Sequence, residues 1–99
     1  MPEYRLSRLA LSDLRSIGET SVRNWSPGQA ETYLTDIGRI LTLLSANPMP
    51  GRSCEKIRKG YRRMEHGRHV TFYLVRDDGI DVIRILHDRM LPKRHFGEE

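Results

Sequence analysis

Apolar and polar positions alternate over residues 3–7, and this period of two is typical of a short strand. Tyr4 and Leu6 would share one face of that strand. Ser7 suits a helix N-cap, because its hydroxyl can accept a hydrogen bond from a free backbone N–H of the first turn. The positions that follow recur at helical steps of three and four: Leu11, Leu14, Ile17 or Gly18, Val22 and Trp25. They predict a first helix with one apolar stripe.

A second, longer helix is predicted from Ser26 onward. Ser26 and Gln29 have the spacing of a capping box, and Pro27 stands at the first helical position, where its missing N–H costs nothing. An apolar stripe then continues at helical spacing: Ala30, Tyr33, Leu34, Ile37, Ile40, Leu41 and Leu44. The pair Asn47-Pro48 should end this helix. Because only residues 24–26 separate the two helices, they should form an antiparallel hairpin.

The period changes to two after a loop at residues 49–52. Strands are predicted at residues 61–65, 68–76 and 80–87, separated by turns at His66-Gly67 and Asp77-Asp78-Gly79. In the middle strand, one face would carry Val70, Phe72 and Leu74. The last strand is apolar on both faces apart from two charged residues, which favours an interior position in the sheet.

The expected order is therefore strand, two helices and three strands (β-α-α-β-β-β). Hairpin-linked strands with grouped helices predict an α+β fold, in which a helical hairpin packs on a small, mostly antiparallel sheet. The chain has 99 residues, 37% of them hydrophobic, and this size suits a single domain over residues 1–99.

Composition excludes several protein classes. No apolar run approaches the roughly 18 residues that a membrane span needs, and the first five residues contain no apolar signal core. A single cysteine, Cys54, excludes an internal disulfide framework. We therefore expect a cytoplasmic protein without membrane contact.

The net charge of +4 is unevenly distributed. Residues 1–51 contain five basic and five acidic side chains, whereas residues 52–99 contain twelve basic and eight acidic ones. All four histidines also lie in the second half. A basic face attracts anionic partners, either nucleic acid or an acidic protein segment, and composition does not choose between them.

Metal and cofactor chemistry find little support in the sequence. His66, His69 and Cys54 do not make a zinc motif, because a zinc site needs three or four ligands at fixed spacing. Cys54 has no base that spacing would identify as its partner. The phosphate-loop and dinucleotide-binding patterns are both absent from the sequence. We expect neither a metal nor any other cofactor.

Metal-free ribonuclease chemistry is the enzymatic alternative. It needs a base for the 2′-hydroxyl, an acid for the leaving oxygen and cations for the phosphate. Residues of these types could lie together on the sheet and its rim: Arg62, Arg63, Arg68, Arg84, Arg89, His69 and His87. The competing interpretation is that these side chains are simply solvated. A plain nucleic-acid-binding module is a third possibility, with Tyr61, Phe72 and Tyr73 stacking on bases.

Three segments resemble the ParE toxins of the ParE/RelE toxin–antitoxin superfamily. They are residues 60–63 (GYRR), 67–73 (GRHVTFY) and 83–90 (IRILHDRM). The resemblance covers about residues 3–91, and its implied fold, a helical hairpin on a mostly antiparallel sheet, agrees with the pattern above. Two activities occur on this fold, so the fold alone does not decide the function.

RelE-like members cleave mRNA on the ribosome with basic residues of the sheet and often a tyrosine near the C-terminus. Here the position of the RelE strand arginine is Val70, with Arg68 two residues earlier, and no tyrosine follows Tyr73. The ending at residues 87–90 (HDRM) looks like the ParE form. ParE-like members inhibit DNA gyrase and are not known as nucleases.

The resemblance therefore implies a toxin that inhibits gyrase by binding and by stabilising its cleaved-DNA complex, not by catalysis of its own. The target-binding residues that it implies are Arg84, His87, Arg89 and Met90. Three more join them on charge alone: Arg62, Arg63 and Arg68. The implied partner is a ParD-like antitoxin in a hetero-oligomer, and its candidate apolar contacts are Trp25, Tyr33 and Leu91.

Overall fold

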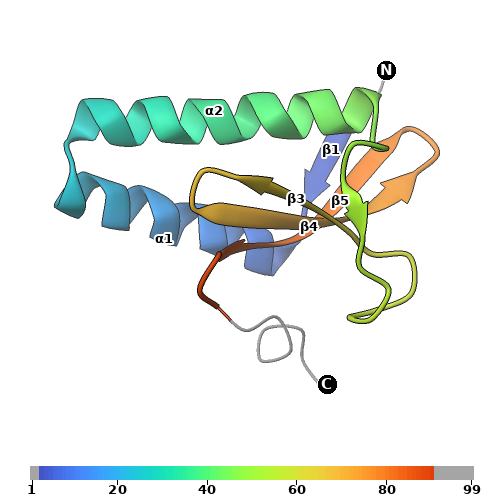
Figure 1. Ribbon diagram of the computed structural model, residues 1–99. Helices are drawn as coiled ribbons and strands as arrows, with labels where there is room; N and C mark the ends of the chain where they lie inside the picture. The colour runs from blue at the N-terminus through green and yellow to red at the C-terminus, as the bar shows by residue number, and fades with distance from the viewer. Residues whose placement is uncertain (1–2, 91–99) are drawn as a thin grey trace.

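The computed structural model describes residues 3–90, and its two helices and five strands form one α+β unit. The elements are β1 (Glu3–Leu6), α1 (Arg8–Asn24), α2 (Pro27–Ala46), β2 (Arg52–Ser53), β3 (Arg62–His66), β4 (His69–Arg76) and β5 (Gly79–His87). The sheet order is β1-β5-β4-β3-β2, and only the β1–β5 pair is parallel. Figure 1 shows the antiparallel helical hairpin that was predicted.

Both helices begin at the predicted caps. The Ser7 hydroxyl accepts a hydrogen bond from the Ala10 N–H at 2.9 Å. The Ser26 hydroxyl accepts one from the Gln29 N–H at 3.1 Å, and Pro27 follows it as the first helical residue. Each cap satisfies an N–H that has no partner within its helix.

α2 packs its apolar stripe against one face of the sheet, whereas in α1 Ile17 is buried but Leu11, Val22 and Trp25 of the predicted stripe are 42%, 47% and 50% exposed. The resulting core contains residues of α1, α2, β4 and β5: Ala10, Ile17, Ile37, Leu41, Leu44, Tyr73, Ile80, Val82 and Ile85. Tyr4 and Leu6 of β1 both pack against this core, as their alternation predicted. The order β1-β5-β4 also confirms that β5 is interior to the sheet.

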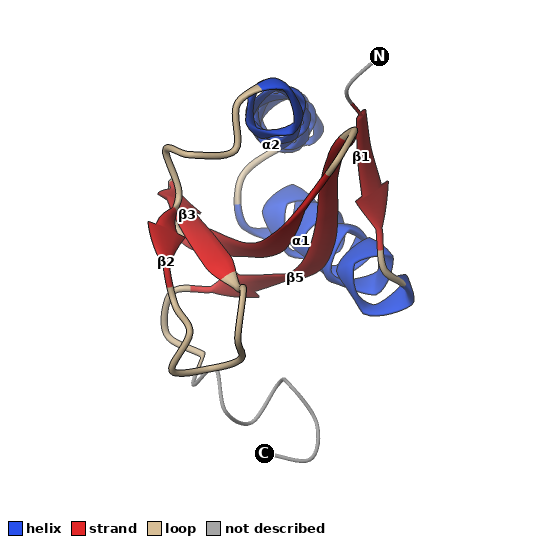
Figure 2. Ribbon diagram, turned by 90° about the vertical axis from the view of Figure 1, so that its right-hand side faces the viewer, coloured by secondary structure: helices blue, strands red, loops and turns tan. Residues whose placement is uncertain are grey.

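The opposite face of the sheet has its own smaller core. It contains Tyr61, Val70, Phe72 and Leu86, with Cys54, Ile57, Leu74 and Ile83 packed against them. Residues 54–61, which connect β2 to β3, supply Cys54, Ile57 and Tyr61 to this cluster; Figure 2 shows their loop at the lower left, away from the helices. The predicted shared face of Val70, Phe72 and Leu74 is thus confirmed. Residues of the loop between β2 and β3 cover this face.

Strand β2 was not predicted, because the sequence analysis placed a loop at residues 49–52. Arg52 pairs with Arg63 and Ser53 pairs with Arg62 in an antiparallel bridge. A strand of two residues is too short to show a period of two, so only the register with β3 reveals it.

The outer edge of β5 is closed partly by a strand and partly by side chains. β1 pairs with β5 only from Gly79 to Val82. Beyond that point the Ser7 hydroxyl donates to the Ile83 carbonyl at 2.7 Å, and an Asp13 carboxylate oxygen accepts from the Ile85 N–H at 2.9 Å. The start of α1 therefore takes over where β1 ends. Neither helix within residues 3–90 combines the length and the apolar character needed to span a bilayer.

Candidate functional site

Arg84 lies inside the fold, in an ion pair with α1. Its Nε and Nη2 atoms donate to the two carboxylate oxygens of Asp13, each at 2.8 Å. Both side chains are only 13% exposed. The hydrogen bond to Asp13 raises the pKa of the Arg84 guanidinium, which stays charged. A register shift between Phe72 and Tyr73 lies opposite this part of β5. The structure thus gives this predicted target-binding residue an intramolecular partner.

Arg62 fastens the connection between α2 and β2. Its Nη2 donates to the Met49 carbonyl at 2.9 Å and also to the Gly51 carbonyl. The Tyr73 hydroxyl donates to the neighbouring Pro48 carbonyl at 2.6 Å. These bonds satisfy three carbonyls of a loop that has no secondary structure of its own, so Arg62 has a structural role.

Arg63 takes part in a surface network on the other side of β3. Its Nη2 lies 3.1 Å from one Glu65 oxygen, and Arg52 donates to the other Glu65 oxygen at 2.7 Å. The Arg63 guanidinium also lies 5.5 Å from the centre of the Phe72 ring, within cation–π range. Arg63 and Arg52 therefore share one carboxylate.

A different arrangement occurs where β5 ends. The chain turns tightly here: the Met90 N–H donates to the His87 carbonyl at 3.0 Å, and the Asp88 N–H donates to the Arg68 carbonyl at 2.9 Å. Arg68, Arg89 and Met90 are exposed, Met90 to 44%. The turn brings these residues beside His87, so four of the seven predicted target-binding residues lie together.

Four aromatic rings connect this turn to the helices. The ring centres are 5.8 Å apart for Trp25 and Tyr33, 5.5 Å for Tyr33 and His69, and 5.4 Å for His69 and His87. Trp25 is half-exposed and Tyr33 is partly buried. The predicted antitoxin contacts Trp25 and Tyr33 are therefore adjacent to predicted target contacts, whereas Leu91 lies outside the described residues.

Tyr33 also fixes the β3–β4 turn. Its hydroxyl accepts from the Arg68 N–H at 3.2 Å and lies 2.6 Å from His69 Nδ1. Gly67 has a φ of +56°, and a Cβ there would come within 2.7 Å of the Tyr33 hydroxyl. Burial and the nearby His87 lower the pKa of His69 to about 4, so the imidazole is neutral near pH 7. We name the β5-end surface by the half-buried His87 and the exposed residues around it: Trp25, Arg68, Arg89 and Met90.

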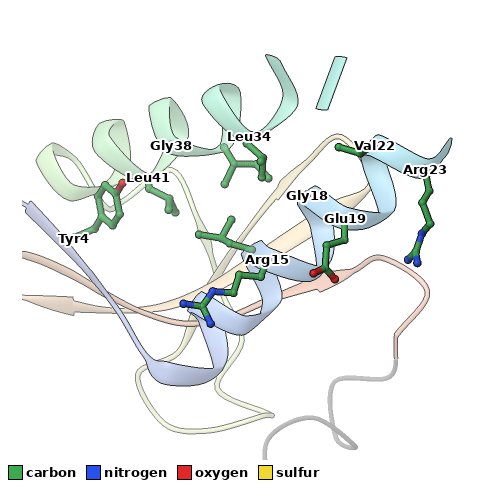
Figure 3. Close-up of a pocket in the computed structure, with 11 residues that line it drawn as sticks. Tyr4, Arg15, Gly18, Glu19, Val22, Arg23, Leu34, Gly38 and Leu41 are labelled. Atoms are coloured by element: carbon green, nitrogen blue, oxygen red, sulfur yellow. The ribbon is translucent and has the colours of Figure 1, made fainter. Parts of the chain in front are cut away.

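A groove of about 1000 Å³ runs between the two helices (Figure 3). Its walls are largely apolar, with Leu34 and Leu41 on α2 and Val22 on α1, and Arg15, Glu19 and Arg23 of α1 also line it, two cations and one carboxylate. Gly18 and Gly38 also line it: a Cβ on Gly18 would meet Leu34 at 3.2 Å, whereas a Cβ on Gly38 would meet nothing within 4 Å. This groove was not predicted from the sequence. The available signal was a glycine on each of the two facing helices, Gly18 and Gly38.

The remaining reactive groups do not form a catalytic set in the described part of the chain. Burial raises the pKa of the Cys54 thiol, which disfavours the thiolate. Burial lowers the pKa of His66, whose Nε2 lies 2.7 Å from the Thr71 hydroxyl. Within residues 3–90 no three His, Cys, Asp or Glu side chains are grouped so that they could hold a metal ion.

Comparison with known proteins identifies the family. The family model described as "ParE toxin of type II toxin-antitoxin system, parDE" matches residues 4–92. The chain is 42% identical over 94 residues to Toxin ParE1 of Mycobacterium tuberculosis (strain ATCC 25618 / H37Rv), covering 94% of this chain and 96% of that protein. It is 37% identical over 97 residues to Toxin ParE1 of Caulobacter vibrioides, covering 98% and 100%.

A solved structure supports the fold. The structure described as the chromosomal ParDE TA system from P. aeruginosa matches with a TM-score of 0.73 and 22% sequence identity, covering 88% of this chain and 96% of that one. The sequence matches extend over nearly the whole chain and include the turn that forms the β5-end surface. The chain thus belongs to the ParE toxin family of type II toxin–antitoxin systems.

Proposed function

We propose that this ParE-family protein inhibits DNA gyrase by binding it and stabilising its cleaved-DNA complex, in the cytoplasm and without catalysis of its own. The observation that carries the proposal is the family-type ending, His87-x-Arg89-Met90, on a turn fixed by backbone hydrogen bonds, with Arg89 and Met90 exposed and His87 half-buried beside them. An exposed cation and an exposed apolar side chain beside an aromatic cluster are typical of a protein-binding surface.

The arrangement of the basic residues supports binding over RNA cleavage. A ribonuclease needs several cations and a proton donor around one phosphate. Of the seven residues of the ribonuclease hypothesis, Arg84 is paired with Asp13 and Arg62 binds carbonyls of a loop, whereas Arg68, Arg89, His69 and His87 lie together at the end of β5. Val70, at the position of the RelE strand arginine, is 4% exposed. Ribosome-dependent mRNA cleavage is therefore the alternative function, and the functional test below distinguishes it from gyrase inhibition.

The partner that we propose for the groove between the helices is an amphipathic segment of a ParD-like antitoxin. Its apolar walls suit the apolar face of a helix, and Arg15 and Arg23, which line it, suit acidic residues of that segment. Toxin and antitoxin would form a hetero-oligomer. The chromosomal ParDE system of P. aeruginosa is a relative of the same fold.

A gyrase assay tests the function directly. Purified protein is added to gyrase, relaxed plasmid and ATP, and the products are scored for supercoiling and for linear DNA released by detergent. We expect loss of supercoiling together with linear DNA. The double variant His87→Ala/Arg89→Ala should lose both effects, whereas Arg39→Ala, a loss of one exposed arginine on α2, should keep them. Unchanged supercoiling at high excess, with mRNA cleavage in a translation extract, would replace the proposal with the nuclease.

A separate variant tests the antitoxin surface. Gly38→Leu places a large side chain in open groove space, and the substitution raises helix propensity by up to about 1 kcal/mol, so folding should not suffer. We expect weaker binding of a ParD-like antitoxin in calorimetry and unchanged gyrase inhibition. Gly28→Leu, a glycine that also has open space around it but does not line the groove, is the matched control. Equal antitoxin affinity of the Gly38 and Gly28 variants would remove the groove from the interface.

A further inference from the structure

A second cavity, of about 420 Å³, lies between the C-terminal half of α1 and the end of β5. Its volume is within the range of small-ligand sites. Uncharged polar side chains line it at successive turns of α1: Ser16, Thr20 and Asn24. Ile17 and Ile85 supply apolar surface, and Trp25 and Met90, both about half-exposed, also line it. The cavity therefore combines hydrogen-bonding edges with apolar and aromatic walls.

The charges of the cavity favour an anion. Among the described lining residues, Asp13 is the one carboxylate, and its two oxygens are already bound to Arg84. Arg68 also lines the cavity, is exposed and carries a full charge. An anionic ligand would meet one available cation and a carboxylate whose charge is compensated.

Hydrogen bonds determine which nitrogens of the two lining histidines carry a proton. Because the Tyr33 hydroxyl oxygen accepts the Arg68 N–H, its own hydrogen is free to be donated to His69 Nδ1. His69 is then neutral with its proton on Nε2. His87 Nδ1 accepts the Arg89 N–H at 3.1 Å and lies 3.0 Å from an Asp88 carboxylate oxygen. In the tautomer in which Nδ1 accepts this N–H, His87 Nε2 carries the hydrogen, and each imidazole then offers one N–H donor.

We propose that this cavity binds a single unstacked nucleotide of a DNA strand, with the base against Trp25 and the phosphate near Arg68 and the imidazole N–H groups. The flat aromatic wall suits a base, the hydroxyl and amide groups on α1 suit its polar edge, and the cation suits its phosphate. The inference rests on the proposed function, because a cleaved-DNA complex offers strand ends whose terminal nucleotides can leave the stack.

Trp25 provides the experimental probe, because it is the single tryptophan of the sequence. Its fluorescence is followed while the purified protein is titrated with a single-stranded tetranucleotide, with a blunt duplex, and with an acidic tetrapeptide. We expect saturable quenching by the single strand and much weaker quenching by the duplex. Quenching by the peptide alone would overturn the proposal in favour of a protein carboxylate, and no quenching by any of the three would also overturn it.

Matched variants separate the cavity from general electrostatic attraction. Arg68→Ala should lower the affinity for the single strand roughly tenfold, as expected for loss of a charged hydrogen bond, whereas Arg39→Ala on the exposed face of α2 should change it less than twofold. Thr20→Val keeps the side-chain volume, removes a lining hydroxyl and should lower the affinity severalfold. Equal losses for the Arg68 and Arg39 variants would overturn the proposal.

The titration contains no gyrase, so its outcome is independent of the proposed function. Gyrase inhibition without single-strand binding would leave the function and overturn this site. Single-strand binding without gyrase inhibition would support the site and overturn the proposed function.

Discussion

Strand β5 has two regions of opposite character within a few residues of one another. In its middle, Arg84 is paired with Asp13, and both side chains are only 13% exposed. At its end, Arg89 and Met90 are exposed on a turn held by backbone hydrogen bonds. Both arginines belong to the same stretch of sequence, residues 83–90, that carries the resemblance to the family.

The difference shows that one sequence motif can combine a residue that the fold requires with exposed residues, for which we propose target recognition. Arg84 joins β5 to α1 through its ion pair with Asp13, so the fold itself explains why an arginine stands at this position. Within residues 3–90 Arg89 forms no ion pair with a carboxylate, and we propose that it serves an external partner. The same substitution to alanine should therefore have different effects at the two arginines. At Arg84 it should lower stability, and at Arg89 it should lower function.

Loss of the Arg84 side chain should have the largest effect on stability. Arg84→Ala leaves Asp13 partly buried without its cation, and breaking such a pair costs about 3 kcal/mol of the free energy of unfolding. Urea unfolding followed by circular dichroism measures this loss. Arg39→Ala, which removes an exposed pair with Asp36, should change the free energy by less than about 0.5 kcal/mol. Equal midpoints for the two variants would contradict the structural role of Arg84.

His69, in the aromatic cluster, should make the free energy of unfolding depend on pH. This effect should be smaller than that of Arg84→Ala and larger than that of Arg89→Ala. The pKa of His69 is about 4 in the folded protein against an ordinary value of 6.5. Between these values the unfolded chain binds a proton that the folded protein does not, so the free energy of unfolding rises with pH through this range and falls on acidification. Because His69 is partly exposed, we expect about 1–2 kcal/mol after allowance for solvent screening.

The pH effect is measured by urea unfolding at several pH values between 4 and 7. The groups that influence His69 come from both helices, the β3–β4 hairpin and the end of β5: Asp13, Tyr33, His66, Arg68, His87 and Asp88. A His69→Gln variant keeps a polar side chain that does not titrate, so its dependence on pH should be shallower. The same slope in the variant and the parent protein would assign the effect to other groups.

The smallest effect on stability, and a large one on function, is expected at the end of β5. Arg89→Ala removes an exposed side chain, so the free energy of unfolding should change by less than about 0.5 kcal/mol. Growth inhibition in cells that express the variant should nevertheless be lost. Retained toxicity with full stability would show that Arg89 is not a target contact. The proposed contrast between a structural Arg84 and a target-binding Arg89 would then fail.

Local features of the fold could be predicted from the sequence. The caps at Ser7 and Ser26 depend on neighbouring residues, and the apolar stripes of both helices depend on a period that one helix contains by itself. The β4–β5 hairpin depends on a turn at residues 77–79. Each of these signals lies within one element or between two consecutive ones.

The candidate site was harder to predict, because its groups are distant in sequence. The Asp13–Arg84 pair joins residues 71 positions apart, and the Tyr33–His69 contact joins residues 36 positions apart. The sequence singled out Arg84 by its motif and Tyr33 by its apolar stripe, but neither pattern contains the partner. The grooves beside α1 were not predicted either. The sequence of a helix does not show which of its positions the neighbouring elements will cover.

The closure of the β5 edge by the first residues of the chain has a consequence for the order of folding. The N-terminal segment finds its hydrogen-bond partners about 75 positions later: Glu3 and Ser7 bond to Asp78 and Val82. During synthesis the helical hairpin can form early, but β1 has no partner strand until β5 has left the ribosome. Such distant pairings must overcome the entropy of closing a long loop and are slow to form. The protein therefore completes the surface on which its proposed activity depends only after β5 has been synthesised.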